Sequence, residues 1–318
     1  MTLRAPACPQ QRGLDRSPWR AALKDMALHA AIPVARAGVR YWPAGQSRER
    51  FWRDRVEPYL AWHAHRFRSR TVFGARIAGD TQEILQQHIY YFGVWEPNLT
   101  RWLQGRLTRG DGFIDVGANV GYFTLLASCL VGSEGSVTAI EASPTLHGCL
   151  CANLARNRTR NVLALNRVAA AQRGLRTVYL GPDSHTGLTT IHADHGWRAE
   201  AQVEAGTVPQ IVGERAWRTA RIVKIDVEAA EDEVATGLAP ALDGTSPELE
   251  VVVELHPDAG RDLFGVFRAA GFHAYALEIS YWPLSYRGTD PAPTARRLEG
   301  PVEGERYVIF SRTDAAAL

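Results

Sequence analysis

The sequence predicts an α/β protein in which a mostly parallel sheet carries helices on both faces. After Gly110, apolar runs of strand length alternate with segments of helical periodicity, which is typical of parallel strands joined by crossover helices. A glycine-rich turn, "GANVG", joins the first strand of this region to its first helix. The last two apolar runs have no clear helix between them, which predicts that the final strand is antiparallel.

The overall composition is that of an ordinary soluble globular protein. The chain has 318 residues, 46% of them hydrophobic and 22% charged, enough for one large domain or one domain with an appendage. A net charge of +2 favours neither a nucleic acid nor a membrane as partner. Four cysteines are too few and too irregularly spaced for a disulfide framework, so we expect a reduced, cytoplasmic protein. The first twenty residues lack the apolar core of a signal peptide.

The N-terminal part differs from the rest of the chain. We expect residues 1–16 to form a disordered tail and residues 17–70 to form a helical cap, with a catalytic domain over 71–318. Ser17-Pro18 is a good helix start, and a second helical pattern begins near Ser47. The cap either packs its aromatic residues on the main domain with its arginines in solvent, or forms a lid over an acidic or sugar-like substrate.

The remaining elements follow from periodicity and from turn residues. We expect a strand-rich insert at about 175–212, made of "LRTVYLGP" and "AQVEAGTVPQIV" around a polar loop. The expected helices are 81–91, one entered through Glu96-Pro97-Asn98, and then 121–131, 144–157, 229–238 and 259–270. The expected strands are 71–77, 112–117, 136–141, 162–169, 221–227, 249–255, 273–278 and 305–311.

The stretch "FIDVGANVGYFTLLAS" places a carboxylate and several small residues where a core strand ends. In an open parallel sheet, ligands bind beyond the carboxyl ends of the strands. Glycines there let the backbone pass close to a ligand, and the following helix offers free N–H groups. Asp115 at the strand end can accept hydrogen bonds from a cationic or hydroxyl-bearing ligand. We therefore expect a small cofactor at this turn.

The spacing of this turn selects among nucleotide cofactors. A dinucleotide fingerprint has G-x-G-x-x-G, with the middle glycine making room for pyrophosphate. Asn119 occupies that position here, which disfavours an NAD-dependent enzyme. Glu141 ends the next strand, "SVTAIEAS", where an acidic residue can bind both ribose hydroxyls. Adenosine without pyrophosphate, joined to a cationic amino-acid arm, describes S-adenosylmethionine.

These motifs resemble those of the FkbM-type methyltransferases, within the class I S-adenosylmethionine-dependent enzymes. The resemblance rests on "DVGANVGYFTLLAS", "VTAIEASP", "IVKIDVEAAEDEVATGL" and "VVVELHP", with "YFGVWEPNLTRWL" upstream, and spans about 90 to 260. It implies a Rossmann-like fold with a seven-stranded sheet and methyl transfer to an oxygen of a sugar or natural-product hydroxyl. The family usually has D-V-E-G-x-E, whereas Ala229 stands here in place of that glycine.

The cofactor site is expected at the carboxyl ends of the first two strands and of the strand at 221–227. Because methyl transfer is an in-line displacement, this edge must also hold the acceptor oxygen close to the methyl group. The residues expected to bind the cofactor are Glu96, Asp115, Gly117, Ala118, Asn119, Gly121, Tyr122, Glu141, Ala142 and Asp226.

The candidate general bases lie on two neighbouring strands. An alcohol must lose its proton as it attacks, so a base within hydrogen-bond reach is useful. Our order of candidates is His256, Glu228 and Asp226. Lys224 needs a carboxylate partner if it is buried, either Asp226 or Glu254.

A divalent metal held by Asp226, Glu254 and His256 is the less favoured option. The histidines at 185, 192 and 195 match no standard zinc spacing.

The leading functional hypothesis is O-methylation of a small-molecule hydroxyl. N-methylation of an amine or amide is an alternative with the same fold, and a non-catalytic binding module is an alternative from a different class. The intact pattern of Asp115, Asn119 and Glu141 argues against the non-catalytic module. No particular oligomeric state is predicted.

Overall fold

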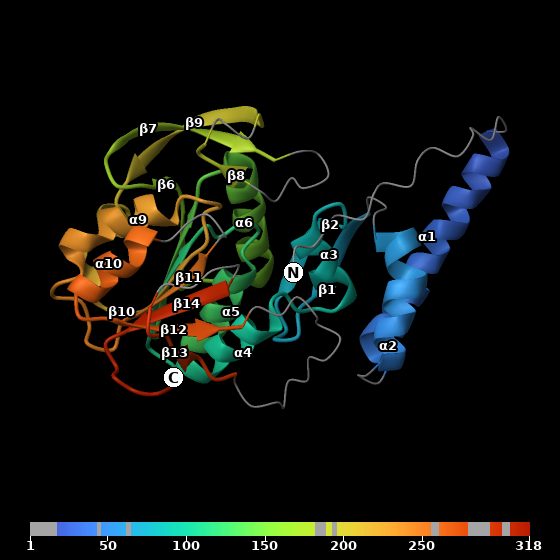
Figure 1. The fold of residues 1–318 in the computed structure, drawn as a ribbon. Coiled ribbons are helices and arrows are strands. Elements are labelled where there is room, and N and C mark those ends of the chain that lie inside the picture. The colour runs from blue at the N-terminus through green and yellow to red at the C-terminus, as the bar shows by residue number, and fades with distance from the viewer. Residues whose placement is uncertain are drawn as a thin grey trace.

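The computed structural model arranges the chain as a large sheet between two layers of helices, with a smaller sheet and a helical N-terminal part added (Figure 1). The sequence-based expectation of an α/β fold is therefore confirmed. The structure describes residues 18–42, 46–61, 65–181, 189–192, 196–255, 261–278, 293–300 and 306–318. The tail expected at 1–16 lies outside these ranges, and so does His256.

The main sheet has eight strands in the order β13-β12-β14-β11-β10-β3-β4-β5. Five neighbouring strands, from β5 to β11, are parallel, and β14 is antiparallel to both β11 and β12. The expected antiparallel last strand is thus confirmed, and a two-residue edge strand is added to the seven expected. The bounds are β3 Gly112–Val116, β4 Ser136–Glu141, β5 Val162–Asn166, β10 Ala220–Ile225, β11 Glu250–Leu255, β12 His273–Leu277, β13 Arg296–Arg297 and β14 Arg306–Ser311.

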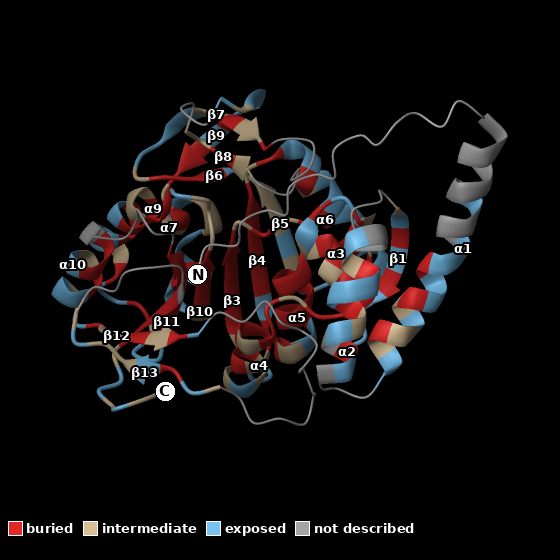
Figure 2. Cartoon of the chain, turned by 45° about the vertical axis from the view of Figure 1, so that its right-hand side comes forward, coloured by how far each residue is buried: buried red, intermediate tan, exposed pale blue. Residues whose placement is uncertain are grey.

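The two faces of this sheet bury separate hydrophobic cores, because successive side chains of a strand point to opposite faces. Phe113 of β3 joins the core beneath the first layer of helices, whereas Ile114 joins the core on the other face. Figure 2 shows the central strands buried between these layers. The first layer is α4 Pro97–Arg106, α5 Tyr122–Val131 and α6 Pro144–Asn157; the second is α7 Val208–Val212, α8 Glu214–Arg218, α9 Glu231–Leu238, the short 3-10 helix Ala239–Ala241 and α10 Arg261–Ala269.

The insert forms a separate four-stranded sheet with the order β6-β9-β7-β8. Its bounds are β6 Val168–Ala169, β7 Gly174–Leu180, β8 Thr189–Thr190 and β9 Arg198–Gly206. The expected strand at 162–169 was wrong in its second half, because Val168 pairs with Ala205 of the insert rather than with the main sheet. The expected strand through 212 was also wrong: Thr207 forms a capping box with Gln210, and α7 begins there.

A β-hairpin connects the N-terminal helices to the main domain. β1 Arg66–Arg70 and β2 Arg76–Asp80 are antiparallel, and α3 Ile84–Tyr91 follows them. The strand expected at 71–77 was wrong because this segment holds the turn of the hairpin, with Gly74 in a left-handed conformation. The hairpin crosses residue 70, the expected boundary of the helical cap. Its outer face carries arginines, and its inner face carries Phe67 and Ser69.

The N-terminal helices are α1 Pro18–Tyr41, α2 Gln46–Phe51 and the π-helix η1 Trp52–Ala61. They contact the hairpin and α3 through both aromatic and polar side chains. Trp52 packs edge-on against Tyr91, as expected for a cap that packs its aromatic residues. The expectation that the arginines of the cap are in solvent was wrong for Arg36, which donates to the Tyr90 carbonyl at 2.9 Å and to the Ser69 hydroxyl at 2.7 Å.

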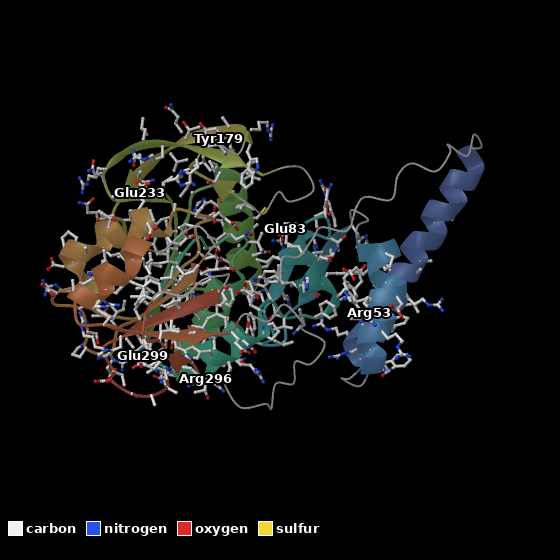
Figure 3. All side chains as sticks on the ribbon, in the orientation of Figure 1. Arg53, Glu83, Tyr179, Glu233, Arg296 and Glu299 are labelled. Atoms are coloured by element: carbon white, nitrogen blue, oxygen red, sulfur yellow. The ribbon has the colours of Figure 1, made fainter. Side chains whose placement is uncertain are left out.

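The N-terminal part of the chain has an exposed ion pair on its helices and a buried N-cap at the start of α3. Figure 3 labels Arg53 on the N-terminal helices and Glu83 at the start of α3. Arg53 pairs with Asp54 at 3.3 Å, and both side chains are at least half exposed. Glu83 is buried and caps α3 by accepting hydrogen bonds from the Leu85 and Gln86 amides.

Within the described ranges, no helix is long and apolar enough to cross a membrane.

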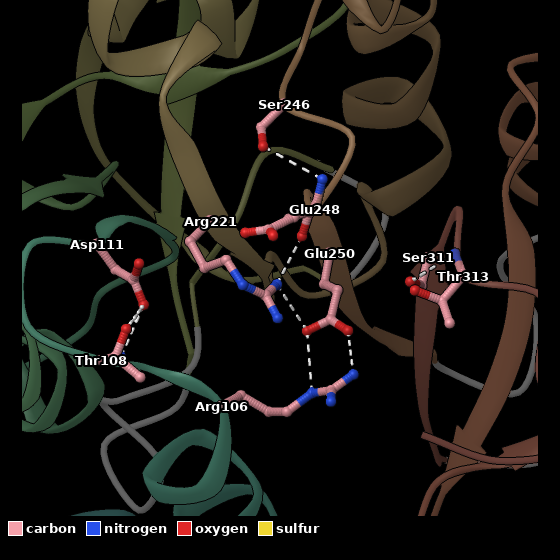
Figure 4. Close-up of polar contacts among 9 residues, drawn as sticks. All are labelled: Arg106, Thr108, Asp111, Arg221, Ser246, Glu248, Glu250, Ser311 and Thr313. Atoms are coloured by element: carbon pink, nitrogen blue, oxygen red, sulfur yellow. Dashed lines mark hydrogen bonds and ion pairs between the residues drawn. The ribbon is translucent and has the colours of Figure 1, made fainter.

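A compensated ion cluster stabilises the amino-terminal edge of the main sheet (Figure 4). Glu250 at the start of β11 is buried, and both of its oxygens accept hydrogen bonds from Arg106 of α4. Arg221 donates to the same carboxylate at 2.9 Å and also to the Glu248 carbonyl. Two guanidinium groups therefore neutralise one buried carboxylate and tie α4 to two strands.

Replacing Glu250 with Ala is expected to lower the free energy of unfolding by about 2–4 kcal/mol, because it leaves two partly buried arginines without their shared carboxylate. The matched control is Arg53→Ala, which removes an exposed pair and is expected to change stability by less than about 0.5 kcal/mol. Urea unfolding followed by circular dichroism measures both. Equal midpoints for the two variants would contradict a stabilising role of this cluster.

Candidate functional site

The glycine turn lies at the carboxyl end of β3 and is held against the end of β4. The backbone amides of Gly117 and Ala118 both donate to the Ile140 carbonyl, at 2.9 and 3.0 Å. Gly117 has a φ of +80°, and a Cβ atom placed there would lie 1.8 Å from the Asp226 carbonyl oxygen. Only glycine therefore fits between the turn and the end of β10. This contact brings three of the predicted site segments together.

Glu141 connects the two strand ends through its carboxylate. One of its oxygens accepts a hydrogen bond from the Asn119 amide at 2.7 Å, and the other accepts from the Ser143 amide at 2.9 Å. Because a carboxylate offers about four acceptor positions, these two bonds leave acceptor positions for hydroxyl groups. Burial raises the pKa of Glu141 to about 7, although the two amides lower it. The arrangement places a carboxylate beside the turn, as the sequence predicts.

The turn also orders the start of α5. Asn119 and Gly121 both have left-handed backbone conformations, and the Gly121 carbonyl receives the first bond of the helix. Tyr122 is buried, with its hydroxyl 3.1 Å from that of Thr100 and its ring against Phe73. Phe123 is buried as well, and Lys224 lies over its ring. Both aromatic residues therefore pack beside the turn.

A row of ionisable side chains crosses the main sheet on the face of α4 and α5. Asp115 of β3 lies directly beside Lys224 of β10 in the strand register, and Glu254 of β11 lies directly beside Tyr307 of β14. Each of these four side chains is buried. The alternation of strand residues explains the row, since all four belong to the same face of neighbouring strands. Tyr307 was not considered in the sequence analysis, whereas Lys224 was considered only as an ion-pair residue and Glu254 only as its possible partner or as a less favoured metal ligand.

Lys224 is the positive charge of this row. Its Nζ lies 2.8 Å from a carboxylate oxygen of Asp226 and 3.9 Å from one of Asp115. Burial lowers the pKa of Lys224, but the negative charges of Asp226 and Asp115 raise it by more. The pKa of Lys224 is therefore above its usual value. The expected pairing of Lys224 with Asp226 is thus confirmed, and Glu254, the other partner considered, also contributes to the field around it.

Asp115 is wholly buried beneath α5. Its Oδ2 accepts a hydrogen bond from the Thr124 hydroxyl at 2.6 Å, and its Oδ1 has no hydrogen-bond partner among the described residues. Burial raises the pKa of Asp115, while Lys224 lowers it. The same Oδ1 lies 3.9 Å from Lys224 Nζ, so one hydrogen bond and one ion pair hold the Asp115 carboxylate next to the glycine turn.

Glu96 and Tyr307 complete the row from outside the central strands. Glu96 precedes α4 in a left-handed conformation, and its side chain is buried. The Tyr307 hydroxyl contacts a carboxylate oxygen of Glu96 and lies 3.2 Å from one of Glu254. Burial, together with the two carboxyl groups, raises the pKa of Tyr307 well above its usual value. Among the described residues, four carboxyl groups thus interact electrostatically with Lys224: Glu96, Asp115, Asp226 and Glu254.

The turn after β10 is held by the insert. Glu228 and Ala229 both have left-handed conformations, with φ of 51° and 72°. The Thr190 hydroxyl donates to the Glu228 carbonyl at 3.4 Å, and the His192 ring lies 3.2 Å from the Ala229 carbonyl. Thr190 and His192 of the insert thus reach this turn. Glu228 itself is partly exposed at the edge of the site.

Among the described residues, no three histidine, cysteine, aspartate or glutamate side chains are arranged to hold a metal ion. His256 belongs to 256–260, outside the described residues, so the metal set of Asp226, Glu254 and His256 stays a less favoured hypothesis.

The Ala142 carbonyl accepts a hydrogen bond from Asn166 at 2.8 Å, which fixes the backbone just after Glu141.

Comparison with known protein families identifies the chain. The family model of the methyltransferase FkbM domain matches residues 115–274, half of the chain. The chain belongs to the FkbM methyltransferase family. It is therefore a methyltransferase, as the sequence motifs predict, and the matched region contains the glycine turn, Glu141 and the buried row up to Glu254.

Comparison with solved structures finds methyltransferases as well. An S-adenosylmethionine-dependent O-methyltransferase from Thermotoga maritima is 15% identical, covers 81% of this chain and 79% of its own, and has a TM-score of 0.40. A precorrin-6y C5,15-methyltransferase from Geobacter metallireducens is 14% identical, with coverages of 67% and 84% and a TM-score of 0.39. No curated protein matches this methyltransferase in a sequence search.

Replacing Ala229 with Gly is expected to stabilise this methyltransferase by about 1 kcal/mol, because a Cβ atom makes the left-handed conformation costly and glycine adopts it freely. The control is Ala235→Gly, in the buried interior of α9, which is expected to destabilise by about 1 kcal/mol or more. Thermal unfolding of the two variants measures the difference. A loss of stability in both would argue against strain at position 229.

Proposed function

We propose that this methyltransferase uses S-adenosylmethionine and methylates a hydroxyl oxygen of a small molecule. The observation that carries the proposal is the pairing of the glycine turn with Glu141, next to a buried group in which the described residues supply more carboxylates than cations. An adenosine ribose needs a carboxylate with acceptor positions left over, and a sulfonium and an ammonium group need surrounding negative charge. The residues of this edge meet both needs.

The residues proposed to hold the cofactor divide by role. Glu141 would accept hydrogen bonds from the ribose hydroxyls. The backbone from Gly117 to Gly121, including Ala118 and Asn119, would lie along the cofactor, and Ala142 would flank the adenine side. Asp115, Glu96 and Asp226 would supply the negative field, and Tyr122 an aromatic wall. When bound, S-adenosylmethionine supplies an electrophilic methyl group.

The chain's own contribution to transfer is positioning and removal of a proton. The acceptor hydroxyl has to lie in line with the bond that breaks, and its proton has to reach a base. Glu228 stands at the edge of the buried row on the turn held by Thr190 and His192. Asp226 forms an ion pair with Lys224, which makes its carboxylate a weaker base. This supports its place as the third candidate for the general base. His256, the residue directly after β11, remains our first candidate base because an imidazole has a suitable pKa range for this role.

Calorimetry of the purified chain with S-adenosylmethionine tests the cofactor. Binding is expected, and Glu141→Gln is expected to weaken it by about 10- to 100-fold, because hydrogen bonds to a charged carboxylate are lost. Glu134→Gln is the matched control, since Glu134 is exposed in the turn before β4 and should leave the affinity unchanged. NAD is expected not to bind. Lack of binding by the unmodified chain would overturn the proposed cofactor.

Replacement of the general base is expected to lower kcat by about 10²- to 10⁴-fold while leaving the Kd for S-adenosylmethionine unchanged. The variants are His256→Ala and Glu228→Gln. Transfer of labelled methyl from S-adenosylmethionine to a panel of monosaccharides and hydroxylated aromatic compounds gives the rate, and mass spectrometry identifies the methylated atom. Full turnover in both variants would exclude these bases, and a product methylated on nitrogen would exclude O-methylation.

A further inference from the structure

Two asparagines of α6 cover the outer edge of the N-terminal hairpin. Among the described strands β2 pairs with β1 alone, so the backbone groups on its other edge need partners. Asn157 accepts a hydrogen bond from the Arg76 amide at 2.8 Å and donates to the Arg76 carbonyl at 2.7 Å. Asn153 accepts from the Ala78 amide at 3.0 Å and donates to the Ala78 carbonyl at 3.4 Å. Two side-chain amides thus take the place of a neighbouring strand where β2 lies beside α6 (Figure 1).

The spacing of the two asparagines matches the repeat of the strand. Residues four positions apart on a helix are separated by about 6 Å along its axis. Alternate residues of a strand are separated by about 7 Å. An asparagine side chain also offers the same kinds of donor and acceptor as a peptide group. Asn153 and Asn157 therefore bind Ala78 and Arg76 in register.

Of these two side chains, only Asn153 also bonds to the glycine turn within the described part of the chain. Its Nδ2 donates to the Val120 carbonyl at 2.9 Å, and both residues are almost completely buried. Val120 lies between Asn119 and Gly121, which both have left-handed backbone conformations. The Asn119 amide is the donor to Glu141. Glu141 thus fixes the turn at Asn119, and Asn153 fixes it one residue later.

The side-chain amide of Asn153 has one favourable orientation. Its oxygen accepts from the Ala78 amide and from Arg156 Nη1, which lies 3.1 Å away, while its nitrogen faces the carbonyls of Val120 and Ala78. Turning the amide over would place its oxygen against two carbonyls and its nitrogen against two donors. The buried Val120 carbonyl would also lose its donor, which is costly away from water. Asn153 therefore holds the turn in one position relative to the hairpin.

The tip of the hairpin makes a second contact with the same region. Phe73 packs edge-on against the ring of Tyr122, with 5.3 Å between the ring centroids. Tyr122 is the first residue of α5, directly after the glycine turn. The hairpin thus supports the turn through Asn153 and the start of the following helix through Phe73.

We propose that Asn153 is a positioning residue for the cofactor and couples the N-terminal hairpin to the glycine turn. The role toward the cofactor rests on the proposed function, in which the backbone from Gly117 to Gly121 lies along S-adenosylmethionine. Asn153 keeps the turn in the conformation in which Asn119 reaches Glu141, so that binding does not have to order the turn. The hairpin then belongs to the cofactor site and not to a separate cap.

Asn153→Leu and Asn157→Leu are a matched pair of variants. Each removes the side-chain amide from one residue of β2 with little change in size, but only Asn153→Leu leaves the Val120 carbonyl without its donor. Titration calorimetry is expected to give a Kd for S-adenosylmethionine about 5- to 50-fold higher in Asn153→Leu. Asn157→Leu is expected to stay within about twofold of the unmodified chain, because it does not touch the turn.

The same titration separates positioning from a general loss of structure. Partial unfolding would lower the number of binding sites per chain and leave the Kd of the folded fraction unchanged. A positioning role raises the Kd with the number of sites kept. Equal Kd values for Asn153→Leu and Asn157→Leu would overturn the proposal.

Amide hydrogen exchange followed by NMR tests the coupling in the unmodified chain. Binding of S-adenosylmethionine is expected to slow exchange of the Ala78 amide, bonded to Asn153, by about fivefold or more. The Arg76 amide, bonded to Asn157, is the internal control and is expected to change less. Equal protection of the two amides would overturn the coupling.

A failure of the proposed function gives a different result. Lack of S-adenosylmethionine binding by the unmodified chain would overturn that function, and exchange in the ligand-free protein then decides the coupling by itself. The Gly121 amide, which donates to the Ala118 carbonyl within the turn, is expected to exchange faster in Asn153→Leu than in Asn157→Leu. Equal exchange of this amide in the two variants would show that Asn153 does not hold the turn.

Discussion

The buried ion pair between Lys224 and its carboxylates is the constraint on which the site depends. A lysine in the central strand of a sheet is costly unless its charge is met, and Asp226 and Asp115 meet it from the same strand and from the neighbouring strand. Meeting that charge fixes the end of β10 against the glycine turn, where Gly117 leaves room for the Asp226 backbone. The same turn is bound to Glu141 through the Asn119 amide, so the ion pair and the proposed ribose-binding carboxylate contact one short segment of backbone.

The two edges of the main sheet have opposite balances of charge among their described residues. At the amino-terminal edge, two arginines surround the single carboxylate of Glu250, so the cluster is satisfied within the fold (Figure 4). At the carboxyl edge, one lysine is shared by several carboxyl groups, and one oxygen of Asp115 has no hydrogen-bond partner among the described residues. The first arrangement serves stability. The second is suited to a ligand that brings positive charge with it.

Local patterns in the sequence predicted the fold, and they are also the basis for the cofactor edge that we propose. The alternation of strand and helix after Gly110, and the acidic residue twenty positions beyond Gly121, are short-range signals that tertiary contacts do not override. The hairpin was missed because β1 alternates Arg with Phe and Ser and is therefore polar overall, and because the apolar stretch around Gly74 forms the turn and not a strand. A Thr-x-x-Gln capping pattern at Thr207 could have indicated the helix that replaces the expected strand.

The buried row could be predicted only in part, because its members meet through strand order rather than through spacing. Lys224 was recognised as needing a partner, and Asp226 is that partner. Tyr307 gave no signal: it reads as one aromatic residue in an apolar strand, and it lies 211 positions from the Glu96 that it contacts. Only the insertion of β14 between β11 and β12 brings it over the site.

That insertion has a consequence for the order in which the protein can be completed. The slot between β11 and β12 is filled by residues 306–311, which are synthesised after both of these neighbouring strands. Until then Glu96 and Glu254 have no phenol between them, and both neighbouring strands present open edges. A nascent chain therefore carries its glycine turn before Tyr307 can join Glu96 and Glu254, and removal of β14 would leave these two carboxyl groups without that phenol.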